Sequence, residues 1–181
     1  MLQAAIYTVA QLLSFLFAMR FVLQLCSVDF YNPLSQSIAT ITNPVTQPLR
    51  KIFPQHKLFD PASLVVLLLI NALYVAITIR LGGHQVPVTA VIAVGGVLSL
   101  ISLFNVLRLS IVAEVILSWL GPSAHQSPLF PVVFRINSPI MNQVRRVIPP
   151  MGGLDLSPMI VLFVIHFAVI GFLQNSLVRV L

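Results

Sequence analysis

The chain has few side chains that could do chemistry, and their spacing matches no catalytic arrangement. Asp29, Asp60, Glu114 and Asp155 are the only carboxylates in 181 residues, and three of them fall in predicted loops or at predicted helix starts. General acid–base catalysis needs titratable groups gathered in one pocket. The sequence also lacks a glycine-rich phosphate loop, a nucleophile elbow, a metal-binding helix pair and a thiol pair. We therefore expect no enzymatic activity and no cofactor.

Histidine and cysteine indicate no metal site either. His56, His84 and His125 lie in predicted loops without ligand spacing. Cys26 is the single cysteine, which rules out an internal disulfide and a cysteine metal cage. The net charge of +6 could suggest nucleic acid, but the basic residues stand beside apolar segments. Orientation in a membrane and contact with anionic lipid are the expected roles of that charge, and no nucleic acid is expected.

Polar residues inside apolar segments are the stronger candidates for function, because a charge within a bilayer is costly. They are Arg20, Asn71, Arg108, Glu114 and His166. Arg20 and Glu114 fall at nearly equal depth, which favours an ion pair between them over two side chains that each reach the interface alone. Arg108 lies about 240° around the helix from Glu114, so it must find a cavity, another helix or the interface. Asn71 and His166 could line a shared axis, although such residues more often hydrogen-bond between helices.

Four apolar segments position these residues. The chain is 58% hydrophobic and 8% charged, with a mean hydropathy of +1.01, whereas a soluble domain has roughly 25% charged residues. A span needs about 20 apolar residues, which predicts membrane helices at 2–25, 62–79 and 158–178. The stretch 88–120 is too long for one upright crossing and too short for two. We place the third span at about 97–120, with 88–96 as an extension that is either tilted or interfacial.

The sequence contains an internal repeat with an offset of 95 positions. Pairs at this offset include Pro33 and Pro128, Pro44 and Pro139, Arg50 and Arg145, Pro54 and Pro149, and Asp60 and Asp155. An internal repeat decides the architecture of a chain. We predict an all-α membrane protein with four transmembrane helices in two tandem repeats, 1–86 and 87–181. Two spans in each repeat give both the same orientation, about an axis along the membrane normal.

The loops 32–54 and 127–149 share an apolar periodicity with steps of 4, 3, 4, 4 and 3, which predicts an interfacial amphipathic helix between the two spans of each repeat. The apolar residues are Leu34, Ile38, Ile41, Val45, Leu49 and Ile52 in the first loop, and Leu129, Val133, Ile136, Ile140, Val144 and Val147 in the second. The opposite face of the first loop is polar and includes Ser35, Thr46 and Gln47.

Proline positions predict where these helices begin and end. Asn43 before Pro44, and Ser138 before Pro139, have the pattern of an N-cap followed by a first-turn proline. Each loop is therefore expected to hold a short helix, a break, and a second helix that starts at the proline. Pro54 and Pro149 are expected to stop the second helices, and Asp60 and Asp155 to open the next spans. A possible bend of the third apolar stretch is placed at Gly95-Gly96.

The distribution of basic residues predicts the orientation. The two long loops carry Arg50, Lys51, Lys57, Arg135, Arg145 and Arg146, and the opposite side carries Arg80 and Arg179. By the positive-inside rule, both loops face the cytoplasm and both termini face outward. The basic pairs Arg50-Lys51 and Arg145-Arg146 are the candidates for docking a partner or anionic lipid. The alternatives are that the loops only set the tilt and spacing of the spans, or that they form a lid over a pore.

Two sequence runs resemble the YggT family of small bacterial membrane proteins. They are RRVIPPMGGLDLSP at 145–158 and DFYNPLSQ at 29–36. The first repeat departs from the pattern, because His56-Lys57-Leu58 stands where the second has Met151-Gly152-Gly153. The resemblance implies a multi-pass protein of the bacterial inner membrane, with roles in osmotic or envelope stress, division, or assembly of membrane complexes.

Two functional hypotheses follow. The first is a scaffold or assembly factor that docks an unknown membrane or cytoplasmic protein, or anionic lipid, through its basic loops. The second is a small ion or osmolyte pathway along the repeat axis, formed by a homo-oligomer and sensitive to changes at Asn71, Arg108, Glu114 and His166.

Overall fold

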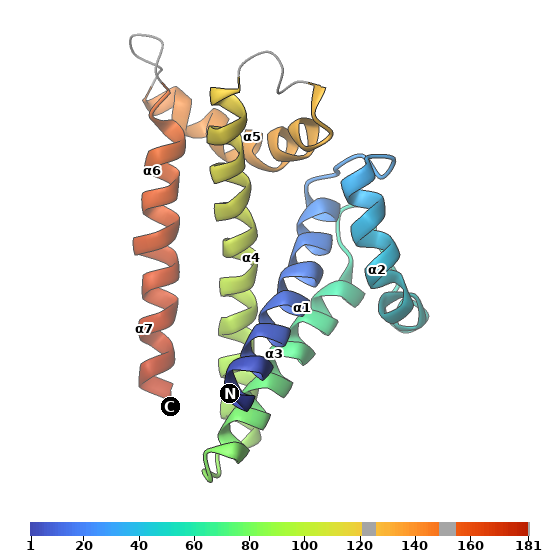
Figure 1. Cartoon of the computed structure of the whole chain (residues 1–181), viewed down its shortest axis with the longest axis vertical. Coiled ribbons are helices and arrows are strands. Elements are labelled where there is room, and N and C mark those ends of the chain that lie inside the picture. Colours follow the sequence, from blue (N-terminus) through green and yellow to red (C-terminus); the bar gives the residue numbers. More distant parts are fainter. Residues whose placement is uncertain (121–125, 149–154, 181) are drawn as a thin grey trace.

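The computed structural model describes residues 1–120, 126–148 and 155–180, and every regular element in them is helical. The elements are α1 (Leu2–Leu25), α2 (Pro33–Leu49), α3 (Pro61–Leu81), α4 (Val88–Trp119), α5 (Leu129–Val147), α6 (Ser157–Phe163), the π-helical segment η2 (Val164–Ile170) and α7 (Gly171–Val180). The last three follow one another without a break and form one long helix, called the fourth helix below (Figure 1).

Among the described residues, four helices are long and apolar enough to cross a membrane. They are α1, α3, α4 and the fourth helix, over Ser157–Asn175. At 1.5 Å per residue, the 32 residues of α4 extend about 48 Å, well beyond the roughly 30 Å of a hydrocarbon core. The predicted extension 88–96 is thus the first part of the α4 helix itself. Both chain termini lie at the end of the bundle away from α5 (Figure 1).

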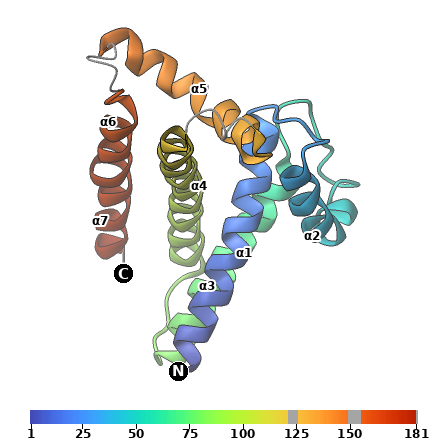
Figure 2. The same ribbon diagram turned by 45° about the horizontal axis from the view of Figure 1, so that its top comes forward.

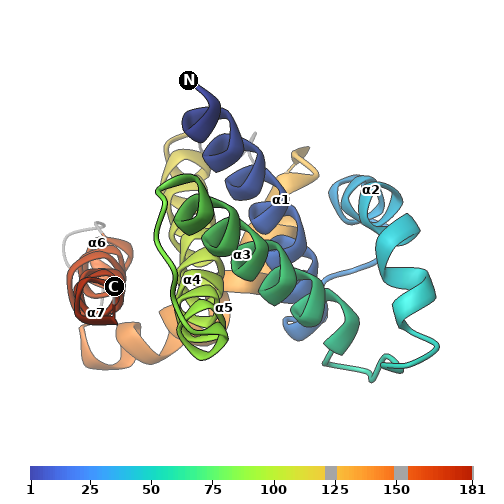
Figure 3. The same ribbon diagram turned by 90° about the horizontal axis from the view of Figure 1, so that it is seen from below.

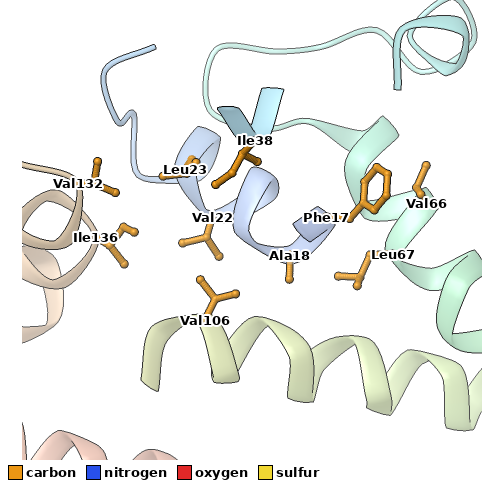
Figure 4. Close-up of a cluster of buried hydrophobic side chains, with 10 residues drawn as sticks. All are labelled: Phe17, Ala18, Val22, Leu23, Ile38, Val66, Leu67, Val106, Val132 and Ile136. Carbon is orange, nitrogen blue, oxygen red and sulfur yellow. The ribbon is translucent and has the colours of Figure 1, made fainter. Parts of the chain in front are cut away.

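The core is built around α1. Phe17, Ala18 and Val22 of this helix are buried, and Figure 4 shows them at the centre of side chains from α2, α3, α4 and α5. The fourth helix packs in a separate apolar cluster with α4 and α5, which includes Ile111 and Met141. In Figures 1 and 3, α4 therefore stands between the α1/α3 pair and the fourth helix.

Small residues bring α3 and α4 into close contact. A Cβ atom added at Gly95 would lie 2.9 Å from both the Cα and the backbone N of Ala72. One turn along α4, Ser99 Oγ accepts a hydrogen bond from Asn71 Nδ2 at 3.1 Å. Small residues and interhelical hydrogen bonds are the usual means by which membrane helices approach closely. Gly95 is therefore a packing contact within the continuous helix α4, and the bend at Gly95-Gly96 stays a prediction.

The predicted breaks at Pro44 and Pro139 are wrong. Pro44 lies inside α2 and Pro139 inside α5, and each helix continues through its proline. A proline within a helix removes one backbone hydrogen bond and kinks it, and α2 and α5 change direction part-way along their length (Figures 2 and 3). Asn43 and Ser138 are therefore interior residues and not N-caps. The side chain of Asn32 caps α2 instead, by accepting a hydrogen bond from Leu34 N at 2.9 Å.

The connecting helices α2 and α5 follow the predicted apolar stripe to different extents. In α5 the buried side includes Val133 and Ile136 of the stripe. In α2 the buried side includes Ile38 of the stripe but also Thr42 and Thr46, whereas Ile41 of the stripe is 60% exposed. Hydrophobic periodicity therefore identified only part of the face of α2 that packs against α1 and α3.

Candidate functional site

Six charged residues form ion pairs at the end of the bundle that carries α2 and α5, called the α2/α5 end below (Figure 1). They form two clusters. The first cluster consists of Arg20, Arg50 and Asp60, and the second of Glu114, Arg145 and Asp155. In each cluster, an arginine at the end of α2 or α5 (Arg50 or Arg145) pairs with the aspartate at the start of the next span (Asp60 or Asp155). A charged residue of the preceding span, Arg20 or Glu114, contacts that pair.

Asp60 is the centre of the first cluster. It stands immediately before α3, at the N-cap position, and is 1% exposed. Its Oδ2 accepts hydrogen bonds from Arg50 Nη2 at 2.8 Å, Arg20 Nε at 3.3 Å and Ser63 Oγ at 2.7 Å. This single oxygen therefore connects α1, the end of α2 and the first turn of α3.

Arg20 also ties α1 to the middle of α2. Its Nη1 donates to the carbonyl of Ala39 at 3.3 Å and to the hydroxyl of Thr42, and its Nη2 donates to Asn43 Oδ1 at 2.9 Å. These acceptors lie directly before Pro44, where the helix lacks one backbone donor. The guanidinium thus supplies donors to the turn of α2 that the proline disrupts.

Arg145 holds the second cluster together. Its Nε and Nη2 both lie 2.8 Å from Asp155 Oδ2, and Nη2 lies 3.3 Å from Glu114 Oε1. The other Glu114 oxygen accepts from Asn137 Nδ2 at 2.8 Å, and Asn137 Oδ1 accepts from Ser110 Oγ. Because Asn137 belongs to α5 and both its partners belong to α4, this chain of contacts fixes α5 across the end of α4.

The two clusters share their geometry but have opposite charge. Arg50 and Asp60 are ten residues apart, as are Arg145 and Asp155, and both pairs meet at 2.8 Å. The third charge is positive in α1 and negative in α4, so the formal charge is +1 in the first cluster and −1 in the second. The hydrogen-bond partner on the connecting helix changes accordingly, because Thr42 accepts from Arg20 whereas Asn137 donates to Glu114.

Two further contacts join the halves of the chain, and sequence reasoning did not find them. Arg135 Nε of α5 donates to the carbonyl of Cys26 at 3.0 Å, where a cation offsets the negative end of the α1 dipole. Asn32 Nδ2 donates to the carbonyl of Pro128 at 2.7 Å. The starts of α2 and α5 are therefore held together directly.

Comparisons with known proteins identify the family of the chain. The sequence model of the family described as CCB3/YggT matches residues 1–81 and 94–177. The chain belongs to this family. Among its relatives, an uncharacterized protein of Pseudomonas aeruginosa is 37% identical over 86% of this chain and 81% of its own length. The protein YggT of Escherichia coli is 32% identical over 93% of this chain and 89% of its own length. No solved structure matches the chain.

Residues near the two ends of the segment 145–158, which resembles the family, make structural contacts. Arg145 and Asp155 form the ion pair of the second cluster, and Asp155 Oδ1 accepts from Ser157 N at 2.9 Å at the start of α6. Pro149 and the Met151-Gly152-Gly153 segment lie outside the described residues. Pro54 lies five positions past the end of α2, after the helix has already stopped at Leu49.

The four basic residues singled out in this CCB3/YggT protein fall into two classes. Arg50 and Arg145 are engaged in the clusters. Lys51 and Arg146 are exposed, and within the described part of the chain neither makes an ion pair or a side-chain hydrogen bond. Each predicted docking pair thus consists of one residue held in a cluster, Arg50 or Arg145, and one exposed cation, Lys51 or Arg146.

The polar residues of the spans are distributed over separate places. The predicted Arg20–Glu114 ion pair is wrong, because each side chain belongs to a different cluster. Asn71 is 1% exposed and bonded to Ser99 and to the carbonyl of Leu67. The equal depth of Arg20 and Glu114 did not imply contact between them, because Arg20 has closer partners on α2 and at the start of α3, and Glu114 has closer partners on α5.

The paired carboxylates make stability depend on pH. Burial raises the pKa of Asp60, but hydrogen bonds from Arg50, Ser63 and Arg20 outweigh it, so this pKa lies below its ordinary value of 3.8. Burial likewise raises the pKa of Asp155, and Ser157 and Arg145 together bring it below 3.8. A depressed carboxylate pKa gives stability that is complete above the unfolded value and is lost as the pH falls through the folded value.

We therefore expect the unfolding midpoint of the detergent-solubilised protein to be constant from pH 7 to about 5, and to fall once the pH drops below about 4. Circular dichroism during thermal unfolding at a series of pH values measures this. The double variant Asp60→Asn/Asp155→Asn is the control, and its midpoint should vary less over the acidic range. An acid-induced loss of the same size in the double variant would mean that other groups cause it.

Proposed function

We propose that this protein is a multi-pass scaffold or assembly factor of the bacterial inner membrane, in which the α2/α5 end faces the cytoplasm and docks a protein partner or anionic lipid. Its two halves, 1–86 and 87–181, are copies of one module, and α2 and α5 lie at the membrane interface. The observation that carries the proposal is the pair of charged clusters, which attach both connecting helices to the spans. A surface held in this way is pre-organised for binding, which lowers the cost of ordering it on association.

The groups left free at this end define the docking surface. Lys51 and Arg146 are exposed cations, and Ile41, Phe30 and Tyr31 are exposed apolar residues at 60%, 63% and 81%. Exposed cations and exposed aromatic side chains at one end of a bundle suit the headgroup region or an acidic partner. We assign the protein's contribution to osmotic or envelope stress tolerance to this surface.

The charge-reversal variant Lys51→Glu/Arg146→Glu is expected to abolish the rescue of a strain that lacks the protein, when that strain grows at high osmolarity. The reason is that two attractive charges become repulsive towards an anionic partner. Growth rate measures the effect, and an immunoblot of the membrane fraction shows whether the variant accumulates. The matched control is Arg80→Glu, which changes a basic residue at the other end of α3. Full rescue by the double variant would contradict docking through this surface.

A flux measurement separates the scaffold from the ion pathway. The pathway residues are divided between the Asn71–Ser99 contact, the second cluster and an Arg108–His166 contact, so we expect no continuous polar route. Purified protein in proteoliposomes under a potassium or osmotic gradient should leak no faster than empty vesicles. Flux that disappears in Asn71→Ala/His166→Ala would overturn the scaffold in favour of a pathway.

A further inference from the structure

A groove among the apolar helices contains a cation that neither cluster uses. It has a volume of about 630 Å³ and lies between α1, α4 and the fourth helix. Its lining is largely apolar and includes Phe15, Leu109 and Phe163. Arg108 of α4 and His166 of η2 also line it, with Arg108 Nη1 3.4 Å from His166 Nδ1.

Arg108 lies well inside the apolar part of α4. It precedes Glu114 of the second cluster by six residues, which places it about 9 Å further along the helix axis. Side chains on a helix lean towards its N-terminus, and the N-terminus of α4 lies at the end away from α5 (Figure 1). The guanidinium is therefore directed away from the nearer headgroups, and Val88 at the other end is about 30 Å distant.

No Asp or Glu side chain pairs with Arg108 in the part of the chain that the structure describes. Asp60, Glu114 and Asp155 are engaged in the two clusters, and Asp29 lies between α1 and α2 at the same end of the bundle. These four are all the acidic residues of the sequence. A second copy would bring the same four at the same depth, so it supplies no counter-ion either. His166 can accept a hydrogen bond from the guanidinium but carries no negative charge.

The groove has the other features of a helix-docking site. Asn105 lies in it beside Arg108, and a second hollow of about 410 Å³ shares Phe15, Asn105 and Arg108 and adds Gln11. These amides offer hydrogen bonds to a polar group that enters beside the cation. The fourth helix forms its π-helical segment at this point, and such segments are frequent at functional sites.

We propose that this groove binds a transmembrane helix of a different membrane protein, and that an Asp or Glu within that helix pairs with Arg108. Charge complementarity selects the partner, because an ionised residue among apolar helices requires a counter-charge. The apolar rim of Phe15, Leu109 and Phe163 packs against the rest of that helix. This interface lies in the apolar part of the bundle, so it is additional to the docking surface at the α2/α5 end.

Site-specific photo-crosslinking in the cells that produce the protein tests the proposal. A photoreactive residue is placed at Leu109 or Phe163, which are 50% and 64% exposed in the groove, and at Leu69 of α3, which is 59% exposed elsewhere. We expect the two groove positions, and not Leu69, to give an adduct with another membrane protein. Mass spectrometry of the cross-linked peptide should place it in a spanning segment that contains Asp or Glu.

The charge of Arg108 should control the yield. Arg108→Gln is expected to reduce the yield of the adduct at least tenfold, whereas Arg108→Lys should retain most of it. Replacing the partner's Asp by Asn, or its Glu by Gln, should reduce the yield as much as Arg108→Gln does. Arg108→Gln breaks no ion pair in the described structure, so its membrane level and unfolding temperature should match the unmodified protein. The Lys51→Glu/Arg146→Glu variant should keep the adduct, which separates failure of this interface from failure of the other.

Several results would overturn the proposal. They are adducts with lipid only, adducts with a second copy of this chain, a partner segment without a carboxylate, the absence of any protein adduct, and a yield that does not change in Arg108→Gln.

Discussion

Replacing Asp60 with Asn is expected to lower the free energy of unfolding by about 3–5 kcal/mol. The substitution keeps the shape of the side chain but removes the charge that Arg20 and Arg50 share. Arg20 is 8% exposed, so its guanidinium would stay buried without a counter-ion, and removing one partner of a buried ion pair is far more costly than never forming it. Chemical unfolding in detergent micelles, followed by circular dichroism, measures the loss.

Asp155→Asn is the matched control, because Asp155 occupies the corresponding position in the second cluster. Its side chain is 28% exposed and that of Arg145 is 30% exposed, so solvent screens the pair. Arg145 also keeps Glu114 as a counter-ion. We expect a loss of about 1 kcal/mol or less. Equal losses for the two variants would show that burial is not what distinguishes the clusters.

Gly95→Ala is expected to lower the free energy of unfolding by about 1–3 kcal/mol, as overpacking of a well-packed core does. The added Cβ would stand 2.9 Å from backbone atoms of Ala72. Backbone cannot rotate away as a flexible side chain can, so α3 and α4 must separate. The same unfolding measurement applies, and a cysteine pair across α3 and α4 would report the separation by its rate of cross-linking.

Gly96→Ala provides the comparison within the same helix turn. An added Cβ at Gly96 meets nothing within 4 Å, and alanine favours a helix over glycine by up to about 1 kcal/mol. This variant should therefore be neutral or more stable. A loss comparable to that of Gly95→Ala would mean that glycine matters here for backbone freedom, and the contact with Ala72 would not be the reason for Gly95.

Hydropathy predicted the four long apolar helices because the length of an apolar run directly limits what it can do in a bilayer. It could not settle α4, because residues 88–96 are as apolar as a span and nothing in composition tells a long helix from a helix with an interfacial extension. In the structure α4 is one unbroken helix from Val88 to Trp119, and Gly95 packs against Ala72 of α3. That contact depends on a residue of another helix, which no local pattern contains.

The proline pattern was misread for a related reason. Asn43-Pro44 and Ser138-Pro139 match the local rule for a helix start, but tertiary contacts override it. Arg20 donates to Ala39, Thr42 and Asn43 and so stabilises the turn before Pro44. Its side chain comes from the preceding span, so a reading of the loop alone cannot include it.

The sequence singled out the residues of the two clusters but did not predict which of them form ion pairs. Asp60 and Asp155 were assigned to helix starts, and Arg50 and Arg145 to docking, although each arginine binds the aspartate ten positions later. The signal was present, because the same ten-residue spacing occurs in both halves of the chain. Matching depth alone suggested Arg20 with Glu114, and it failed because a closer partner at the helix ends neutralises each of them.

The opposite charges of the two clusters give the bundle a lateral polarity. Their formal charges of +1 and −1 sum to zero, but the first cluster joins α1, the end of α2 and the start of α3, and the second joins α4, the end of α5 and the start of α6. The two halves are therefore not interchangeable, although their geometry is similar. A chain built from two copies of the first half would place like charges at both sites. The natural chain instead has a distinguishable front and back, because Arg20 of one cluster and Glu114 of the other stand in corresponding places with opposite sign.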